Sequence, residues 1–309
     1  MQDSALSYLR HGQSPFFRLP ASRDVANAEV AVLGVPYDGG TTYQPGARLA
    51  PFHVRRVSAL LQSHHPVHGI DVFRDLRCVD GGNIVFPPFD REAMRAAVEA
   101  EIRQLSAALV TPLVFGGDHS VTLPILRALA KRHGPLAVVQ VDAHLDLSTA
   151  EVWGEDFHHG TVFRHAIDEG LIADGQLYQL GLRGPRGAET DDALARARGH
   201  HAVSADEIGE RGPKRVCAEV RERIGRHRPV YVSFDIDAVD PAHAPGTGTP
   251  VPGGITAREA LALVRGLAGT NVIGGDIVEV CPPLDHADIT AHLAAHLAWE
   301  LLAVIATRS

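Results

Sequence analysis

Short apolar runs recur along the chain, and most are followed by a loop rich in glycine and aspartate and then by an amphipathic segment. The apolar runs predict strands that begin near Val30, Thr111, Leu136, Gln176, Pro229 and Val272. The amphipathic segments predict helices over residues 91–109, 122–134, 214–226, 257–269 and 289–306. Because the strands are apolar throughout, they resemble parallel strands that are buried on both faces. The pattern therefore predicts an α/β fold built on a parallel sheet.

The composition narrows the class of protein. The 309 residues are 45% hydrophobic and 21% charged, which is ordinary for a globular domain. The formal net charge of −8 gives no basic footprint, so neither nucleic acid nor an anionic membrane is an expected partner. We find no apolar run of about 18 residues or more, so we expect no membrane-spanning helix.

The three cysteines carry little functional information. Cys78, Cys217 and Cys281 are far apart and match no metal-binding or redox spacing. We interpret each as a small buried apolar residue, and a reducing cytoplasm is the simplest location for the chain.

Polar side chains gather where the predicted strands end. In parallel sheets, functional groups collect at the carboxyl ends of the strands. The segments that follow three of these strands are rich in aspartate and histidine. The candidate ligands that they supply are His119, Asp142, His144, Asp146, Asp235 and Asp237.

The spacing of these residues raises an electrostatic problem. On an extended backbone, residues two apart share a face, so Asp235 and Asp237 would lie close together and repel each other. Asp142, His144 and Asp146 would share a face for the same reason. Imidazoles and carboxylates without thiolates suit Mn²⁺, and six ligands suit two ions that share bridging carboxylates.

Each cluster also has a simpler interpretation. A lone aspartate at a strand end is usually a cap or turn residue, and Asp240 is better interpreted in that way. The glycines before Asp118 could form a phosphate cradle, but no Walker lysine follows them. Three such clusters, each at the end of a predicted strand, are better explained by metal binding than by helix capping.

Three segments resemble the signature motifs of the ureohydrolases, the family that includes arginase and agmatinase. They are "GGDHS" (116–120), "DAHLD" (142–146) and "SFDIDAVDPAHAPGTGTPVPGG" (233–254), and the likeness extends over nearly the whole chain. The resemblance implies a single-domain, three-layer arginase-like fold, with an eight-stranded parallel sheet flanked by helices. We expect this catalytic domain to span residues 21–309, after an N-terminal extension of residues 1–20. The resemblance also implies hydrolysis of a guanidino group to an amine and urea, two Mn²⁺ ions per subunit, and a homo-trimer or hexamer.

The resemblance also implies a role for each site residue. One ion is assigned to His119, Asp142, Asp146 and Asp235. The other is assigned to Asp142, His144, Asp235 and Asp237, so that Asp142 and Asp235 bridge the ions.

The remaining roles belong to three residues. Asp146 would accept a hydrogen bond from the attacking water. In "FHHGT", His159 matches the family's proton shuttle, and its neighbour His158 is interpreted as a wall or surface residue. The segment "GGDIVEV" (274–280) resembles the family's strand whose glutamate binds the guanidinium, which implies that role for Glu279. The chemistry is consistent, since a carboxylate can accept two N–H bonds from that planar group.

The substrate is less clear from the sequence. Against arginine, the loop of residues 147–160 lacks the asparagines of arginase, and Gly184 stands where arginase has an acidic residue. The main prediction is agmatine, and the alternative is a guanidino acid, as in guanidinobutyrase or proclavaminate amidinohydrolase. An arginase, an amide deacetylase of the same fold and a non-catalytic homologue are the remaining interpretations. Loop candidates for contacting the far end of the substrate are Arg183, Arg186 and Glu155.

Overall fold

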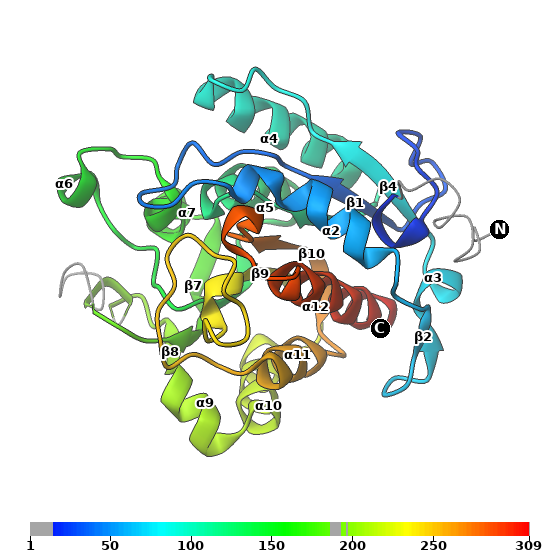
Figure 1. The fold of residues 1–309 in the computed structure, drawn as a ribbon. Helices are drawn as coiled ribbons and strands as arrows, with labels where there is room; N and C mark the ends of the chain where they lie inside the picture. The colour runs from blue at the N-terminus through cyan, green and yellow to red at the C-terminus, as the bar shows by residue number, and fades with distance from the viewer. Residues whose placement is uncertain (1–14, 186–192, 196, 309) are drawn as a thin grey trace.

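The fold is organised around one large sheet in which every pair of neighbouring strands is parallel (Figure 1). The computed structural model describes residues 15–185, 193–195 and 197–308. In spatial order, the eight strands are β4 (Cys78–Asn83), β1 (Val30–Gly34), β5 (Thr111–Phe115), β10 (Asn271–Val278), β9 (Pro229–Asp235), β6 (Leu136–Val141), β7 (Ile172–Leu182) and β8 (His201–Ser204). A separate antiparallel pair consists of β2 (His64–His65) and β3 (Ile70–Asp71).

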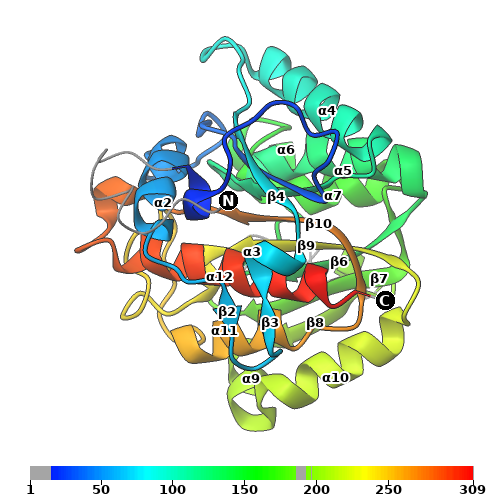
Figure 2. The ribbon, with the colours of Figure 1, turned by 90° about the vertical axis from the view of Figure 1, so that its right-hand side faces the viewer.

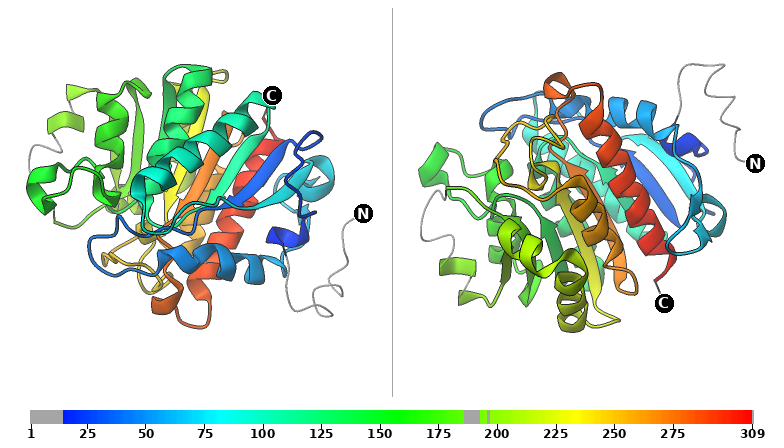
Figure 3. Two further views of the ribbon diagram at one scale, coloured as in Figure 1. Left: turned by 90° about the horizontal axis from the view of Figure 1, so that it is seen from above. Right: turned by 60° about the horizontal axis from the view of Figure 1, so that its bottom comes forward.

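Helices cover both faces of the sheet, as the two views of Figure 3 show. One face is covered mainly by α2 (Ala50–Ser58), α3 (Val72–Asp75), α9 (Ala205–Arg211), α10 (Pro213–Ile224), α11 (Ala257–Arg265) and α12 (Ile289–Ala306). The other face is covered by α4 (Arg91–Ala107), α5 (Thr122–His133) and α7 (Val162–Asp168), while the short helix α6 (Ala150–Trp153) lies in a loop. The prediction of an eight-stranded parallel sheet flanked by helices is confirmed.

Alternate residues of each central strand enter two hydrophobic cores. In β9, Val230 and Val232 pack on the α12 side, whereas Tyr231 packs on the α5 side. All three side chains are fully buried. The continuous apolar runs in the sequence therefore reflect two buried faces, as predicted for a parallel sheet.

The predicted elements agree with the structure where apolar patterning is strong. Helix α12 has the predicted bounds, 289–306. Helix α4 begins at the predicted residue, Arg91, and ends at Ala107, two residues earlier than predicted. The edge strands β4 and β8 were not predicted. Their sequences, "CVDGGN" and "HAVS", are short and contain polar residues or glycine, because an edge strand needs less apolar surface.

The last helix, α12, differs from one expectation. By length and composition it is apolar enough to cross a membrane, contrary to the expectation that no such stretch exists. In the structure, however, 72% of this helix is buried, and it packs on α11, α2 and β10 (Figure 2). This is the burial of a core helix in a folded domain.

The described part of the N-terminal segment also packs into the core. Phe16 and Phe17 are fully buried, and Phe16 stacks on Phe115 with ring centroids 4.7 Å apart. Residues 1–14 lie outside the described part, so the division at residue 20 stays a prediction. All three cysteines are free and buried, as predicted.

Candidate active site

The three polar segments share one local conformation at the strand ends. Each begins with an aspartate whose Oδ1 accepts the backbone N–H of the residue two positions later. The N–O distances are 2.9 Å from Asp118 to Ser120, 2.7 Å from Asp142 to His144, and 2.8 Å from Asp235 to Asp237. This aspartate turn bends the chain out of the sheet as soon as the strand ends.

The turns correct the geometric argument from the sequence. Strand β6 ends at Val141 and β9 ends at Asp235, so neither ligand segment is extended. Asp237 lies in a 3-10 turn, and Asp146 has a positive φ of 53°. The six predicted ligands do lie close together. The turns after the strands bring them together, and not the side-chain alternation of an extended strand.

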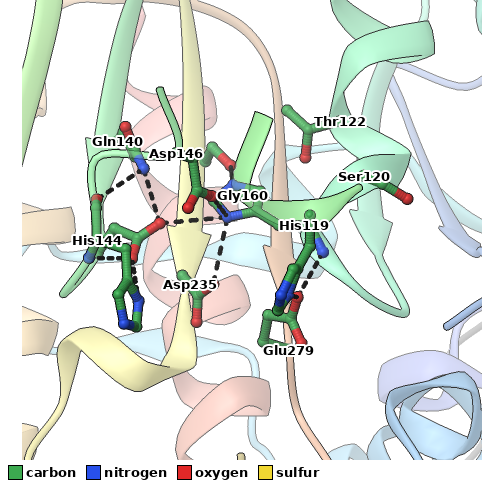
Figure 4. A network of polar contacts seen from close by, with 12 residues as sticks. His119, Ser120, Thr122, Gln140, His144, Asp146, Gly160, Asp235 and Glu279 are labelled. Carbon is green, nitrogen blue, oxygen red and sulfur yellow. Dashed lines mark hydrogen bonds and ion pairs between the residues drawn. The ribbon is translucent and has the colours of Figure 1, made fainter. Parts of the chain in front are cut away.

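The side chains converge around His119 (Figure 4). Its Nδ1 lies 3.2 Å from an Asp142 oxygen, 2.9 Å from an Asp146 oxygen and 3.2 Å from an Asp235 oxygen. The Nδ1 of His144 lies 3.0 Å from Asp237 and 3.5 Å from Asp142. All six predicted ligands therefore fall in one cluster.

The cluster is buried, and its charges are crowded. Burial raises the pKa of Asp146 to about 6, and the neighbouring Asp142 charge adds to this effect. Burial also raises the pKa of Asp235 well above its usual range, with a further contribution from Asp237. The Asp237 charge is the main influence that raises the pKa of His144 to about 12. The carboxylates therefore require positive charge beside them to stay ionised.

The donor set fits divalent cations. Two groups of ligand atoms each lie within 4.8 Å of one another: His119, Asp142 and Asp146 form one, and Asp142, His144 and Asp237 form the other. They share Asp142, and the buried Nδ1 of His119 makes no hydrogen bond of acceptable geometry although it faces carboxylates. An unpaired imidazole nitrogen among carboxylates is the arrangement that a metal ion would complete.

The glycines of "GGDHS" serve close packing rather than phosphate binding. A side chain at Gly117 would collide with the carbonyl oxygen of Tyr37. That same oxygen accepts the backbone N–H of Asp118 at 2.9 Å. The carbonyl of Gly117 in turn accepts the N–H of Glu279 at 2.9 Å, so the close approach fixes two strand ends relative to each other.

His159 and Glu279 form a second buried pair beside the cluster. The Nδ1 of His159 lies 2.8 Å from Oε1 of Glu279, which also accepts the backbone N–H of His119 at 2.8 Å. Burial tends to lower the pKa of His159, but the Glu279 charge outweighs it and raises the pKa to about 9. Glu279 has a positive φ of 62°, a strained conformation for a non-glycine residue that is often found at functional sites.

Thr42 is a site residue that the sequence did not reveal. Its backbone N–H donates to Nε2 of His159 at 3.2 Å, and its hydroxyl lies 2.7 Å from the same nitrogen. Because Nε2 accepts this bond, the ring proton of neutral His159 lies on Nδ1, toward Glu279. Thr42 belongs to a loop without an ionisable cluster, so only its place in the folded chain identifies it.

A pocket of about 240 Å³ opens above the cluster, which suits a small molecule. Its walls beyond the cluster include Thr42, Ser148, Val152, Trp153, His158, Pro185 and Thr249. The sequence pattern does not reveal Thr249 either, and its hydroxyl donates to Oδ2 of Asp237 at 3.2 Å. His158 is 3% exposed and caps the turn that carries His159, in keeping with its interpretation as a wall residue.

The loop candidates for the far end of the substrate are otherwise engaged. Arg183 donates to a set of backbone carbonyls that includes those of Asp237 and Val251, so it braces the loops. Glu155 pairs with Arg91 at 3.0 Å. Arg186 lies outside the described residues.

Asp240 lies apart from the cluster. Its carboxylate accepts the backbone N–H groups of Ala242, Gly253 and Gly254 at 2.8–3.0 Å. It therefore organises a turn, as the sequence indicated.

Comparisons with known proteins identify the family of the chain. The model of the arginase family matches residues 28–304. Proclavaminate amidinohydrolase from Streptomyces clavuligerus is 46% identical over 95% of this chain and 93% of its own length. A solved structure of that enzyme superimposes with a TM-score of 0.91 at 45% identity, covering 96% of this chain and 98% of the other.

Two further relatives bear on the substrate. Guanidinopropionase from Pseudomonas aeruginosa is 44% identical, covering 96% of this chain and 92% of its own. The mitochondrial agmatinase from Gallus gallus is 38% identical, covering 95% and 86%. These identities favour the guanidino-acid alternative over the main prediction of agmatine. The chain belongs to the arginase family and is a metal-dependent ureohydrolase that hydrolyses a guanidino compound.

Proposed function

We propose that this ureohydrolase acts on a guanidino acid, which carries a guanidino group at one end and a carboxylate at the other, and that it uses two Mn²⁺ ions. The observation that carries the metal part is the pair of ligand groups that share Asp142. The higher identity to relatives named for guanidino acids supports the substrate part.

The six residues of the cluster divide between the two ions. We assign His119 and Asp146 to one ion, His144 and Asp237 to the other, and Asp142 and Asp235 to both. The distances support this division, because the His119 nitrogen faces Asp146 and the His144 nitrogen faces Asp237. When bound, the two cations would stabilise negative charge and lower the pKa of water.

The chain's own residues supply proton transfer and orientation. Asp146 is a carboxylate at the base of the pocket that can accept a proton from the attacking water. Glu279 can accept a hydrogen bond from the guanidinium, which it would hold beside the cluster. Water adds to the guanidinium carbon, the bond from that carbon to the substituted nitrogen breaks, and the leaving amine takes up a proton.

His159 is the proposed donor of that proton. Its raised pKa of about 9 keeps the ring protonated near neutral pH. In the protonated ring, the Nε2–H can donate to the Thr42 hydroxyl, which lies 2.7 Å away, and the Nδ1–H points to Glu279, so both contacts fix the ring at the pocket wall. A held and protonated imidazole at this position is suited to general acid catalysis.

The described pocket walls offer no charged partner for either an ammonium or a carboxylate beyond the cluster and its histidines, so the substrate proposal rests on the sequence identities. Agmatine ends in an ammonium group, which would favour a carboxylate near the pocket mouth, and a guanidino acid ends in a carboxylate, which would favour a cation there. Among the described lining residues, the acidic side chains are those of the cluster itself. The wall that would contact the rest of the substrate is formed instead by hydroxyl and apolar groups such as Ser148, Val152 and Trp153.

Urea release tests the proposal directly. The purified, manganese-loaded protein is assayed in parallel with 3-guanidinopropionate, 4-guanidinobutyrate, agmatine and arginine, and kcat/KM is compared. We expect a guanidino acid to give the highest value. A higher value for agmatine would overturn the substrate assignment, and metal analysis of the same sample tests the two-ion stoichiometry separately.

A further inference from the structure

A row of four polar side chains crosses the centre of the sheet. Gln140 of β6 is paired in register with Gln179 of β7 and with Ser233 of β9, and Ser233 is paired with Asp276 of β10. All four residues are 0% exposed. A buried polar group lowers the stability of the fold unless it is hydrogen-bonded. A continuous row of buried polar side chains therefore suggests that the row has a functional role.

This polar row lies directly beneath the metal-ligand cluster. Gln140 and Ser233 each precede a proposed bridging ligand, Asp142 or Asp235, by two residues. The neighbouring residue Tyr231 belongs to the core on the α5 side, and the ring of His119 contacts Phe163 of the same core. The row therefore forms a layer between the apolar core and the cluster.

Asp276 is the carboxyl group of the row. One of its oxygens accepts the Ser233 hydroxyl at 2.7 Å, and the other accepts the hydroxyls of Tyr231 at 2.7 Å and Thr122 at 2.6 Å. Within the described part of the chain, no Lys, Arg or His lies within ion-pair distance of it. Burial raises the pKa of Asp276, and the nearby His119 and the three hydroxyl donors oppose that shift. Thr122 begins the helix that follows His119 (Figure 4).

The hydroxyl of Ser233 connects this carboxyl group to His119. The Oγ of Ser233 lies 2.8 Å from Nε2 of His119. A serine hydroxyl has one proton, and an ionised carboxylate can only accept. Since Ser233 donates its proton to Asp276, its oxygen must accept from Nε2–H of His119, and the lone pair of the ring is then on Nδ1.

We infer that Asp276, acting through Ser233, is a positioning residue that fixes the orientation and tautomer of His119, so that Nδ1 is available to a metal ion. The inference rests on the two-ion site proposed above. Nδ1 is the buried nitrogen that faces the carboxylates of Asp142, Asp146 and Asp235. Partners that orient a metal-binding histidine typically contribute a factor of about 10–100 in metal affinity.

The other half of the row supports a different ligand. The side-chain amide of Gln140 donates to Oδ2 of Asp142 at 2.7 Å, and Gln179 donates to Gln140 at 2.7 Å. Asp142 belongs to both ligand groups, whereas His119 belongs to one. The two halves of the row should therefore have distinguishable effects on the two ions.

Calorimetric titration of the metal-stripped protein with Mn²⁺ tests the inference. We expect two binding events in the wild-type chain, and we expect Ser233→Ala and Asp276→Asn to weaken one of them by about 10–100-fold. The double variant should be no weaker than the weaker single variant, because both changes interrupt one chain of bonds. Gln140→Leu should weaken both events.

The matched control is Tyr231→Phe, which removes a hydroxyl from the same carboxylate but leaves the Ser233 path intact. It should leave both events unchanged, and thermal unfolding of each metal-stripped variant checks that the fold persists. Two unchanged events in a folded Ser233→Ala or Asp276→Asn variant would overturn the inference. If the wild-type chain itself fails to bind two ions, the proposed metal site fails instead, so the two failures are separable.

Discussion

The described chain holds one cluster of histidine and carboxylate groups at the strand ends and another beside α12, and the first is the one suited to a cation. The second consists of His65, His68 and Glu300, whose ligand atoms also lie within 4.8 Å of one another. There, both oxygens of Glu300 pair with Arg265. Residue type and proximity alone therefore do not identify a metal site.

The two clusters differ in whether their carboxylates already have cationic partners and whether their histidine nitrogens already take part in hydrogen bonds. In the second cluster, the Nε2 of His65 is bonded to Glu300 at 3.0 Å, and its Nδ1 accepts the backbone N–H of His68 at 3.2 Å. In the cluster of the candidate active site, several carboxylates share histidine nitrogens, and His119 Nδ1 stays unbonded. A cation is needed where negative charge exceeds the positive charge around it.

The largest expected effect is that of Asp235→Ala. Removing a proposed bridging carboxylate should abolish metal binding and lower urea release by about 10³-fold or more, since the cations supply several kcal/mol of stabilisation. Metal content and kcat are measured on the same sample. Full activity in this variant would contradict the bridging assignment. It would also remove the evidence that the cluster of the candidate active site, unlike the cluster of His65 and Glu300, binds metal.

His159→Ala comes next. Loss of the proposed proton donor should lower kcat by about 10²-fold or more, because general acid catalysis contributes on that scale. The metal content should not change, since His159 is not a proposed ligand. Unchanged turnover would assign proton transfer to another group.

Glu300→Ala probes the second cluster. It should lower the free energy of unfolding by about 1–3 kcal/mol, because it leaves the partly exposed Arg265 and the buried His65 without their partner. Denaturant unfolding gives this value, and metal analysis should give the wild-type stoichiometry. A loss of bound metal would show that the second cluster also holds an ion.

The smallest effect concerns pH. The folded chain holds the proton of His159 up to about pH 9, whereas an unfolded histidine releases it near pH 6.5. The pair with Glu279 therefore stabilises the fold fully below about pH 6.5 and less as the pH rises toward 9.

We expect Glu279→Gln to lower the free energy of unfolding more at the acidic end of this range than at the alkaline end, by about 1 kcal/mol. Glutamine can still bond to the ring, so the difference is smaller than the full pKa shift would give. Denaturant unfolding at both ends of the range measures it. A larger loss at the alkaline end would reverse the sign assigned to the ion pair.

The sequence predicted the fold and the cluster for the same reason. Strands buried on both faces are mostly apolar, so the polar clusters that follow them stand out, as His119 and Asp142 do. The local backbone was harder to predict. The turns at Asp142 and Asp235 depend on side-chain hydrogen bonds to the main chain, which an argument from strand alternation does not include.

Residues without a charge pattern could not be found in the sequence. Thr42 is more than a hundred positions from His159, and their contact arises only because the loop after β1 folds over the strand ends. Arg183 failed as a substrate contact because folding surrounds it with carbonyl oxygens. Both outcomes depend on long-range packing.

By itself, the sequence determined the parallel sheet, the set of candidate ligands and the family, because each depends on residue type and short-range spacing. The tertiary structure decided which buried clusters have unbalanced charge, which nitrogen of His119 is free, and which polar residues support it. The register of β6, β9 and β10 sets the distances between Gln140, Ser233 and Asp276. Hydrogen bonds and charge balance depend on such distances, and only the folded chain fixes them.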